Sequence, residues 1–189
     1  MTAKQPLLCR REDSLLLIVD IQERLAAAMP REACEIVFRN TAILSRAAEK
    51  LEVPRLLTEQ YPKGLGPTES VVLEHLTGNV GRFEKTSFSC CGGTGFASAL
   101  LNSGRRQVII AGMEAHVCVL QTAMELSTDG FEVYVVEDAT CSRNPDNHRN
   151  AMRRLRRAGV VVANTESVVF EWLRDSRHEH FKEISALLR

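Results

Sequence analysis

The segment Ala111-Gly112-Met113-Glu114-Ala115-His116-Val117-Cys118-Val119 decides the fold prediction, because it joins a buried strand to a helix. Residues 107–111 (QVIIA) precede it as a short apolar run without alternation, which is typical of a strand buried on both faces of a parallel sheet. A helix is expected over residues 115–128, ending near Gly130. This strand-turn-helix arrangement places Cys118 near the start of the helix, at the edge of the sheet, where nucleophiles recur.

The same alternation of strand and helix extends along the chain. Further strands are predicted at 15–20 (LLLIVD), 54–58 (PRLLT), 132–136 (EVYVV) and 160–163 (VVVA), with residues 82–88 as a separate extended segment. Helices are expected at 32–51, 95–102, 145–158, 166–173 and 180–188. The pattern predicts a three-layer α/β/α sandwich, with a doubly wound, mainly parallel sheet of five to six strands and Rossmann-like topology. We expect one domain over residues 1–189, with its core at about 14–173 and C-terminal helices to 189.

Composition excludes several classes of function. The 24 basic and 24 acidic residues give zero net charge, so nucleic acid and anionic membranes are not expected as partners. No apolar run is long enough for a transmembrane helix, and residues 1–14 lack the apolar stretch of a signal peptide. The six cysteines follow neither a disulfide framework nor a C-x-x-C pattern. We therefore expect a cytoplasmic protein with reduced thiols.

Three residues could carry chemistry beyond the carboxyl ends of the strands, where ligands bind in doubly wound sheets. Asp20 ends an apolar strand and needs a partner there, unless it only caps a helix near Gln22. Cys118 lies near a helix N-terminus, which lowers a thiol pKa, although it could instead be a buried spacer between two valines. Lys85 is flanked by apolar residues, and an ordinary surface lysine is the simpler interpretation. Each residue taken alone is compatible with both a catalytic and a structural role.

Together the three residues form a chemically sensible set. An aspartate can take the proton of a cysteine, and a lysine can stabilise the thiolate. His116 is only two residues from Cys118, so on a helix it points elsewhere, and we expect it at a pocket wall or the surface rather than as a base. A lowered pKa predicts that iodoacetamide labels Cys118 before the other five cysteines near neutral pH.

Three segments, in this order, resemble the isochorismatase-like cysteine hydrolase superfamily. Residues 17–22 (LIVDIQ) are similar to its strand-ending D-x-Q, residues 83–89 (FEKTSFS) to its lysine segment, and residues 111–119 (AGMEAHVCV) to its nucleophile segment. Residues 57–68 (LTEQYPKGLGPT) and 181–184 (FKEI) resemble the narrower subgroup of isochorismatase domain-containing proteins. The resemblance covers roughly residues 14–173.

The resemblance implies a hydrolase with a catalytic triad of Asp20, Lys85 and Cys118. It also implies a cis peptide bond between Met113 and Glu114, which would aim the N–H groups of Glu114 and Cys118 at one point as an oxyanion hole. From the resemblance we further expect a small-molecule substrate, an amide C–N bond as the scissile bond, no cofactor and a homo-oligomer.

The substrate pocket and the metal content are further expectations. Gln60, Tyr61 and Phe88 are candidate pocket walls, with plain loop packing as an equally open alternative. Nicotinamidases of the superfamily carry an Asp-x-His metal motif after the second strand. Here residues 59–62 read EQYP, without a histidine, so no metal is expected. Asp138 and Ser142 resemble a D-x-x-x-S region with a structural role.

Three other functions compete with the hydrolase prediction. The chain could be a non-catalytic protein that keeps the hydrolase fold, although a scaffold has no need of all three site residues. It could be a redox-regulatory protein that uses Cys118 or the adjacent Cys90 and Cys91. Residues 153–157 (RRLRR) could bind nucleic acid, but a solvated basic helix face suits the zero net charge better.

Overall fold

The computed structural model describes residues 8–189, so residues 1–7, on which the expected absence of a signal peptide partly depends, lie outside it. Within the described residues one sheet runs in the order β3-β2-β1-β4-β5-β6, and all its pairings are parallel. Its strands are β1 (Ser14–Val19), β2 (Arg55–Gln60), β3 (Val80–Lys85), β4 (Gln107–Met113), β5 (Glu132–Cys141) and β6 (Val161–Ala163). Strand order reverses direction between β1 and β4, which confirms the doubly wound parallel sheet.

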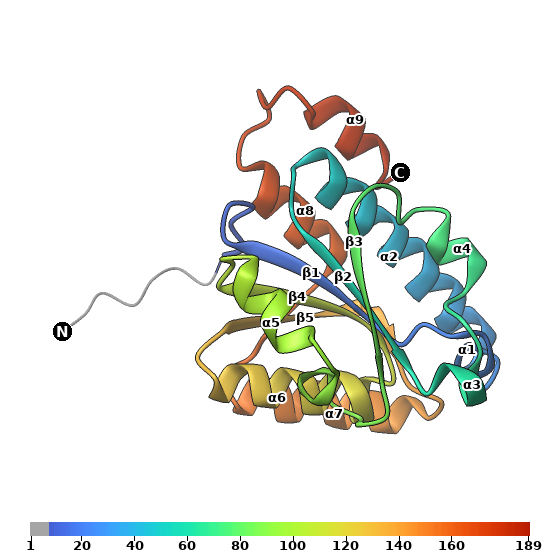
Figure 1. Cartoon of the computed structure of the whole chain (residues 1–189). Coiled ribbons are helices and arrows are strands. Elements are labelled where there is room, and N and C mark those ends of the chain that lie inside the picture. The colour runs from blue at the N-terminus through green and yellow to red at the C-terminus, as the bar shows by residue number, and fades with distance from the viewer. Residues whose placement is uncertain (1–7) are drawn as a thin grey trace.

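Helices cover both faces of this sheet (Figure 1). One face carries α2 (Arg31–Lys50), α8 (Thr165–Leu173) and α9 (Phe181–Ala186), and the other carries α5 (Phe96–Asn102), α6 (Leu120–Thr128) and α7 (Pro145–Arg157). The three-layer prediction is therefore confirmed. Short helices α1 (Glu23–Ala26), α3 (Pro62–Leu65) and α4 (Ser70–Leu73), the 3-10 turn η1 (Cys90–Gly92) and the π-helical turn η2 (Ala115–Val119) fill the connections. None of the helices between residues 8 and 189 has both the length and the apolar character to cross a bilayer.

The two hydrophobic cores explain why the strands are apolar without alternation. Successive side chains of a strand point to opposite faces. On β1, Leu16 and Ile18 pack into the core under α2, whereas Leu15 and Leu17 pack into the core under α5, α6 and α7. Each such side chain stabilises the fold by about 1.5–3 kcal/mol through burial. Both faces of the sheet are thus occupied, as in other parallel sheets.

The predicted elements were wrong mainly at their ends. Residues 80–85 form a full strand, β3, rather than a separate extended segment. β5 continues through Glu137 and Asp138 to Cys141, because a register shift opposite β4 accommodates these polar residues and pairing then resumes. The helix predicted over 115–128 is divided into η2 and α6.

Gly112 marks the closest approach between the two central strands. Its φ is +128°, and a Cβ built on it would lie 2.0 Å from the carbonyl oxygen of Val19. Only glycine allows β4 to lie this close to β1 at that level. The contact fixes the end of β1, where Asp20 follows.

Candidate active site

Asp20 and Lys85 form a buried ion pair at the carboxyl edge of the sheet. Lys85 Nζ donates to Asp20 Oδ2 at 2.6 Å, and both side chains are 0% exposed. Thr58, on β2, donates its hydroxyl to Asp20 Oδ1 at 2.8 Å. The ends of β1, β2 and β3 therefore supply one carboxylate with a donor on each oxygen, which is what a buried charge requires.

The ammonium group of Lys85 is fully occupied by protein acceptors. Besides Asp20, it donates to Gln60 Oε1 at 2.8 Å, to the Phe88 carbonyl at 2.9 Å and to the Ser87 carbonyl at 3.2 Å. An ammonium has three N–H donors, so none is left over for a substrate. Lys85 thus acts as a fixed positive charge. Gln60 helps to hold that charge in place, and its expected role at a pocket wall stays a prediction.

Cys118, in η2, is buried, and its thiol lies close enough to Asp20 for that carboxylate to shift its pKa. Burial raises the pKa of Cys118, the negative charge of Asp20 raises it further, and Lys85 offsets only part of this. The expected lowering of this pKa is therefore wrong, and the raised pKa removes the reason to expect that iodoacetamide labels Cys118 first. The helix N-terminus does not outweigh burial beside a carboxylate. What the site holds is a protonated thiol in contact with its potential base.

Glu114 directly follows β4 and precedes η2, the turn that carries Cys118. The peptide bond between Met113 and Glu114 is cis. The Glu114 carbonyl accepts hydrogen bonds from Val117 N at 3.0 Å and Val119 N at 3.3 Å, and the Cys118 N–H is not among its donors. The backbone here consequently differs from a regular helix start, in which the fourth residue on would donate to that carbonyl.

The Glu114 side chain is held by Arg143. Arg143 Nη2 donates to Oε1 at 2.6 Å and the Arg143 backbone N–H donates to Oε2 at 2.9 Å. Burial raises the pKa of Glu114, but the hydrogen bonds and charge of Arg143 outweigh it, so the pKa is lowered overall. Sequence reasoning missed Arg143, because its approach to Glu114 depends on the extension of β5.

Replacing Arg143 with Gln is expected to cost about 1–3 kcal/mol of unfolding free energy at pH 7, because a 3% exposed carboxylate loses its main donors. A lowered folded-state pKa stabilises the fold above the ordinary value of 4.5, and this contribution disappears as pH falls through the folded value. The difference between wild type and variant should therefore shrink below pH 4.5 in urea titrations. Arg149→Gln removes an exposed pair with Asp146 and serves as the control. If the difference in unfolding free energy between wild type and Arg143→Gln stayed constant from pH 7 to pH 3, ionisation of Glu114 would not be its cause.

The remaining predicted residues lie around this centre. His116 is half-buried, and its Nδ1 lies 2.9 Å from Ser142 Oγ, which engages that side of the ring. Tyr61 and Phe88 are 54% and 55% exposed, on loops that flank Lys85. Tyr61 donates its backbone N–H to the Lys85 carbonyl at 2.8 Å. Their role as pocket walls stays a prediction.

Two further polar residues organise the site without having been predicted. Thr58 could have been found from the sequence, because it ends the second predicted strand at the same edge as Asp20. Gln22 is fully buried and donates to the carbonyls of Gln60 and Gly66 at 3.0 and 2.7 Å. It also excludes the alternative that Asp20 caps a helix, since Gln22 itself is the N-cap of α1.

Two residues expected to be structural have partners that fit that role. Asp138 Oδ1 accepts from the backbone and hydroxyl of Thr165, and Ser142 contacts His116. In the part of the chain that the structure describes, no group of three or more His, Cys, Asp or Glu side chains is arranged to hold a metal ion.

Comparisons with known proteins agree with this fold. The isochorismatase domain model matches residues 14–167. Zebrafish isochorismatase domain-containing protein 2 is 39% identical over 175 residues, covering 93% of this chain and 86% of that protein. The MAR1 ribonuclease from Caenorhabditis elegans has a TM-score of 0.90 at 34% identity, over 96% of this chain and 92% of that one. The Escherichia coli YcaC gene product, an octameric hydrolase of unknown specificity, shares the fold at 23% identity, with a TM-score of 0.86 and coverage of 98% and 97%. The chain belongs to the isochorismatase family.

Proposed function

We propose that the protein is a cysteine hydrolase that cleaves a C–N (amide) bond of a small molecule through Asp20, Lys85 and Cys118. The observation that carries this proposal is the wholly buried Lys85–Asp20 ion pair, whose charges both act on the pKa of the Cys118 thiol. A purely structural core would be more stable with apolar residues in these positions. A buried thiol with a shifted pKa beside an ion pair is typical of an active site.

The reaction begins with proton transfer from Cys118 to Asp20. The sulfur attacks the amide carbon, and the resulting oxyanion is stabilised by the N–H groups of Glu114 and Cys118, each worth about 3–4 kcal/mol in comparable sites. Asp20 then passes its proton to the leaving amine, which departs as the C–N bond breaks. A thioester remains on Cys118. Water hydrolyses it, with Asp20 taking the water proton and returning it to the sulfur.

The raised pKa of Cys118 determines how this reaction starts. Because the thiol is protonated in the free protein, deprotonation accompanies attack on a bound substrate rather than preceding it. Lys85 places a fixed positive charge beside Asp20 and stabilises the thiolate as it develops. A site of this kind is protected from adventitious alkylation and becomes nucleophilic only when a carbonyl is in place.

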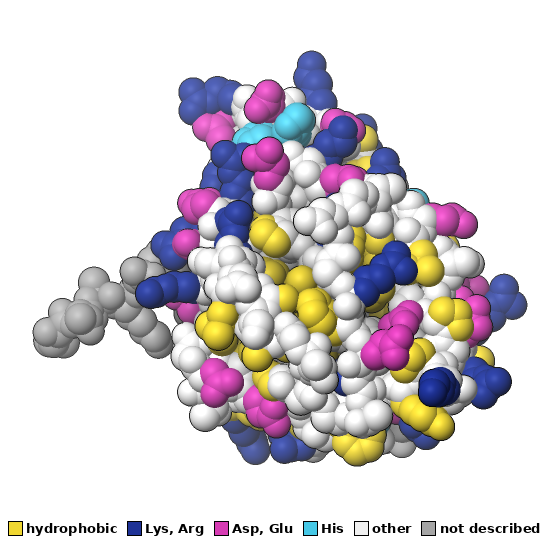
Figure 2. Space-filling view, in the orientation of Figure 1, with side chains coloured by type: hydrophobic (Ala, Val, Ile, Leu, Met, Phe, Trp, Pro, Cys, Tyr) yellow, Lys and Arg dark blue, Asp and Glu magenta, His cyan; other side chains and the backbone are white. Residues whose placement is uncertain are grey.

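RNA is the less favoured substrate, although the C. elegans relative is named a ribonuclease. Cys118 is only 4% exposed, which suits a small molecule better than a polymer backbone. On the face seen in Figure 2, acidic and basic side chains are interspersed rather than gathered by sign. Zero net charge also gives no long-range attraction for phosphates.

The test is a panel of small amides, with a structured and a single-stranded RNA as the alternative substrates. Samples are acid-quenched during turnover and analysed by intact mass and peptide mapping. We expect amine release and an acyl adduct on Cys118 in the wild type, and neither in Cys118→Ala nor Cys118→Ser. Cys91→Ser replaces a half-buried cysteine outside the triad and should behave like the wild type. Full amide turnover by both Cys118 variants, or RNA cleavage without any amide turnover, would contradict the proposal.

We also propose that the protein forms a homo-oligomer. The E. coli relative is octameric, and the exposed aromatic rings of Tyr61 and Phe88 are large apolar groups left uncovered in a single chain. Light scattering coupled to size-exclusion chromatography should give a mass above that of the 21.1 kDa chain. A monomer at micromolar concentration would contradict this.

A further inference from the structure

Two thiols from distant parts of the chain meet outside the candidate active site. Cys34 lies in the first turns of α2, and Cys141 is the last residue of β5. The two thiols are close enough to shift each other's pKa, and Cys34 Sγ donates a hydrogen bond to the Ala26 carbonyl at 3.3 Å. Both side chains are buried, and both cysteines are free thiols. Neither takes part in the proposed hydrolysis.

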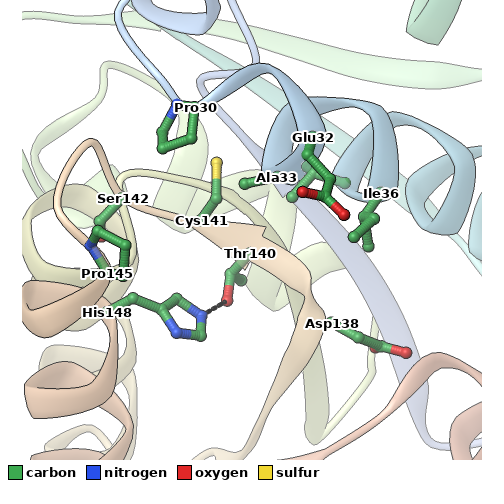
Figure 3. Close-up of a pocket in the computed structure, with 11 residues that line it drawn as sticks. Pro30, Glu32, Ala33, Ile36, Asp138, Thr140, Cys141, Ser142, Pro145 and His148 are labelled. Atoms are coloured by element: carbon green, nitrogen blue, oxygen red, sulfur yellow. Dashed lines mark hydrogen bonds between the residues drawn. The ribbon is translucent and has the colours of Figure 1, made fainter.

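A cavity of about 370 Å³ adjoins this pair. It lies between the start of α2, the end of β5 and the start of α7. Its lining includes residues on both sides of Cys34 in the sequence, together with Cys141 itself: Pro30, Ala33, Val37, Cys141 and Ser142. Figure 3 shows the Cys141 sulfur pointing from the end of β5 toward Pro30 and Ala33. A small oxidant in the cavity would therefore lie against Cys141 and against the turns of α2 that carry Cys34, although both cysteines are buried.

We propose that Cys34 and Cys141 form a dithiol that a hydroperoxide converts to an intramolecular disulfide. Cys34 sulfur attacks one peroxide oxygen, the O–O bond breaks, and a sulfenic acid and one water result when the peroxide is hydrogen peroxide. Cys141 sulfur then attacks the sulfenic sulfur. The S–S bond forms, the S–O bond breaks, and the hydroxyl leaves with the Cys141 thiol proton as a second water. The two sulfur atoms are oxidised and the peroxide is reduced.

The order of attack follows from the local chemistry. The neighbouring thiol of Cys141 lowers the pKa of Cys34, and Cys34 also lies near the N-terminus of a long helix. Cys34 is thus the better nucleophile, and Cys141 is the resolving thiol beside it. The other cysteines lack this arrangement, since Cys9 is hydrogen-bonded to Glu171 and Cys90 lies beside Asp20.

The disulfide would connect α2 to a strand end that supports the candidate site. Cys141 pairs in register with Met113, which precedes Glu114. The residue two positions after it, Arg143, holds the Glu114 carboxylate. The cross-link therefore restrains the segment that positions Glu114. This inference does not depend on the proposed hydrolysis.

The experiment treats the full chain with hydrogen peroxide, blocks remaining thiols with N-ethylmaleimide in denaturant, and maps linked peptides by mass spectrometry. We expect a peptide that links Cys34 to Cys141 and disappears on treatment with dithiothreitol. Cys34→Ser and Cys141→Ser should each lose this peptide completely. Cys9→Ser is the matched control, because it removes another buried thiol and should leave the link intact.

Mapping of the wild type keeps the test decisive even if a serine variant folds poorly. The proposal is overturned if the main intramolecular disulfide joins Cys90 to Cys91 or includes Cys118. It is equally overturned if Cys34 and Cys141 are both recovered as maleimide adducts after Cys118 has been oxidised.

Discussion

Replacing Lys85 with Met is expected to lower the unfolding free energy by about 3–5 kcal/mol, because it leaves a buried carboxylate without its cation. Asp20 and Lys85 are both 0% exposed, so no water can take over when the ammonium is removed. The methionine side chain has similar length and fills the space, so the change isolates the charge. Urea unfolding monitored by circular dichroism gives the free energy. Under the proposed mechanism the same variant has no detectable amide turnover.

A double-mutant cycle separates the loss of the pair from the cost of an unpaired charge. Asp20→Leu alone leaves the ammonium with only the neutral acceptors of Gln60, Ser87 and Phe88. The combined variant, Asp20→Leu with Lys85→Met, should recover most of the stability lost by either change, since an apolar pair replaces a buried ion pair at little cost. Turnover should remain absent in all three variants. The double variant would then be stable but inactive, which separates the effect of these positions on stability from their effect on activity.

Lys50→Met is the matched control for this series. Lys50 Nζ lies 2.9 Å from Glu183, and the two side chains are 46% and 52% exposed. A pair so exposed is worth about 0–1 kcal/mol, because water screens it in both the folded and the unfolded chain. If Lys85→Met destabilised the protein no more than Lys50→Met, the Asp20–Lys85 pair could not be buried as described.

The placement of Asp20 and Cys118 at one edge could be predicted from the sequence, because both lie at or beyond the ends of predicted strands. In a parallel sheet these ends share one edge, so the strand pattern brings residues distant in the chain together. Lys85 joined them only through the family resemblance, since its strand, β3, was expected as a separate extended segment. The ionisation of Cys118 could not be predicted in the same way. It depends on how deeply the thiol is buried and on its contact with Asp20, and neither is encoded locally.

Other parts of the site depend on tertiary detail that no periodic pattern carries. The pairing of Arg143 with Glu114 depends on β5 continuing past its register shift. The polar residues Glu137 and Asp138 make the strand look as if it ended before that shift. The proximity of Cys34 to Cys141 likewise could not be predicted, because it depends on where α2 starts above the sheet. The short helices α1, α3 and α4 have four residues each, too few for apolar periodicity to reveal.

Gly112→Ala is expected to be the most damaging single substitution, with a loss above about 4–5 kcal/mol or no folded protein at all. The new Cβ would lie 2.0 Å from the carbonyl oxygen and 2.7 Å from the amide nitrogen of Val19, and both are backbone atoms of a central strand. They cannot move aside without separating β1 from β4, the pairing on which both cores are built. The positive φ of +128° adds backbone strain.

Gly130→Ala separates these two contributions. Gly130 also has a positive φ, +90°, but a Cβ there would meet nothing within 4 Å. It should therefore cost only about 1–2 kcal/mol, the strain of a left-handed backbone alone. Soluble yield and urea midpoints of the two variants give the comparison. If both lost the same amount, the close approach of β4 to β1 would contribute nothing. A larger loss at Gly112 means that the close approach of β4 to the end of β1, directly before Asp20, is essential to the central sheet.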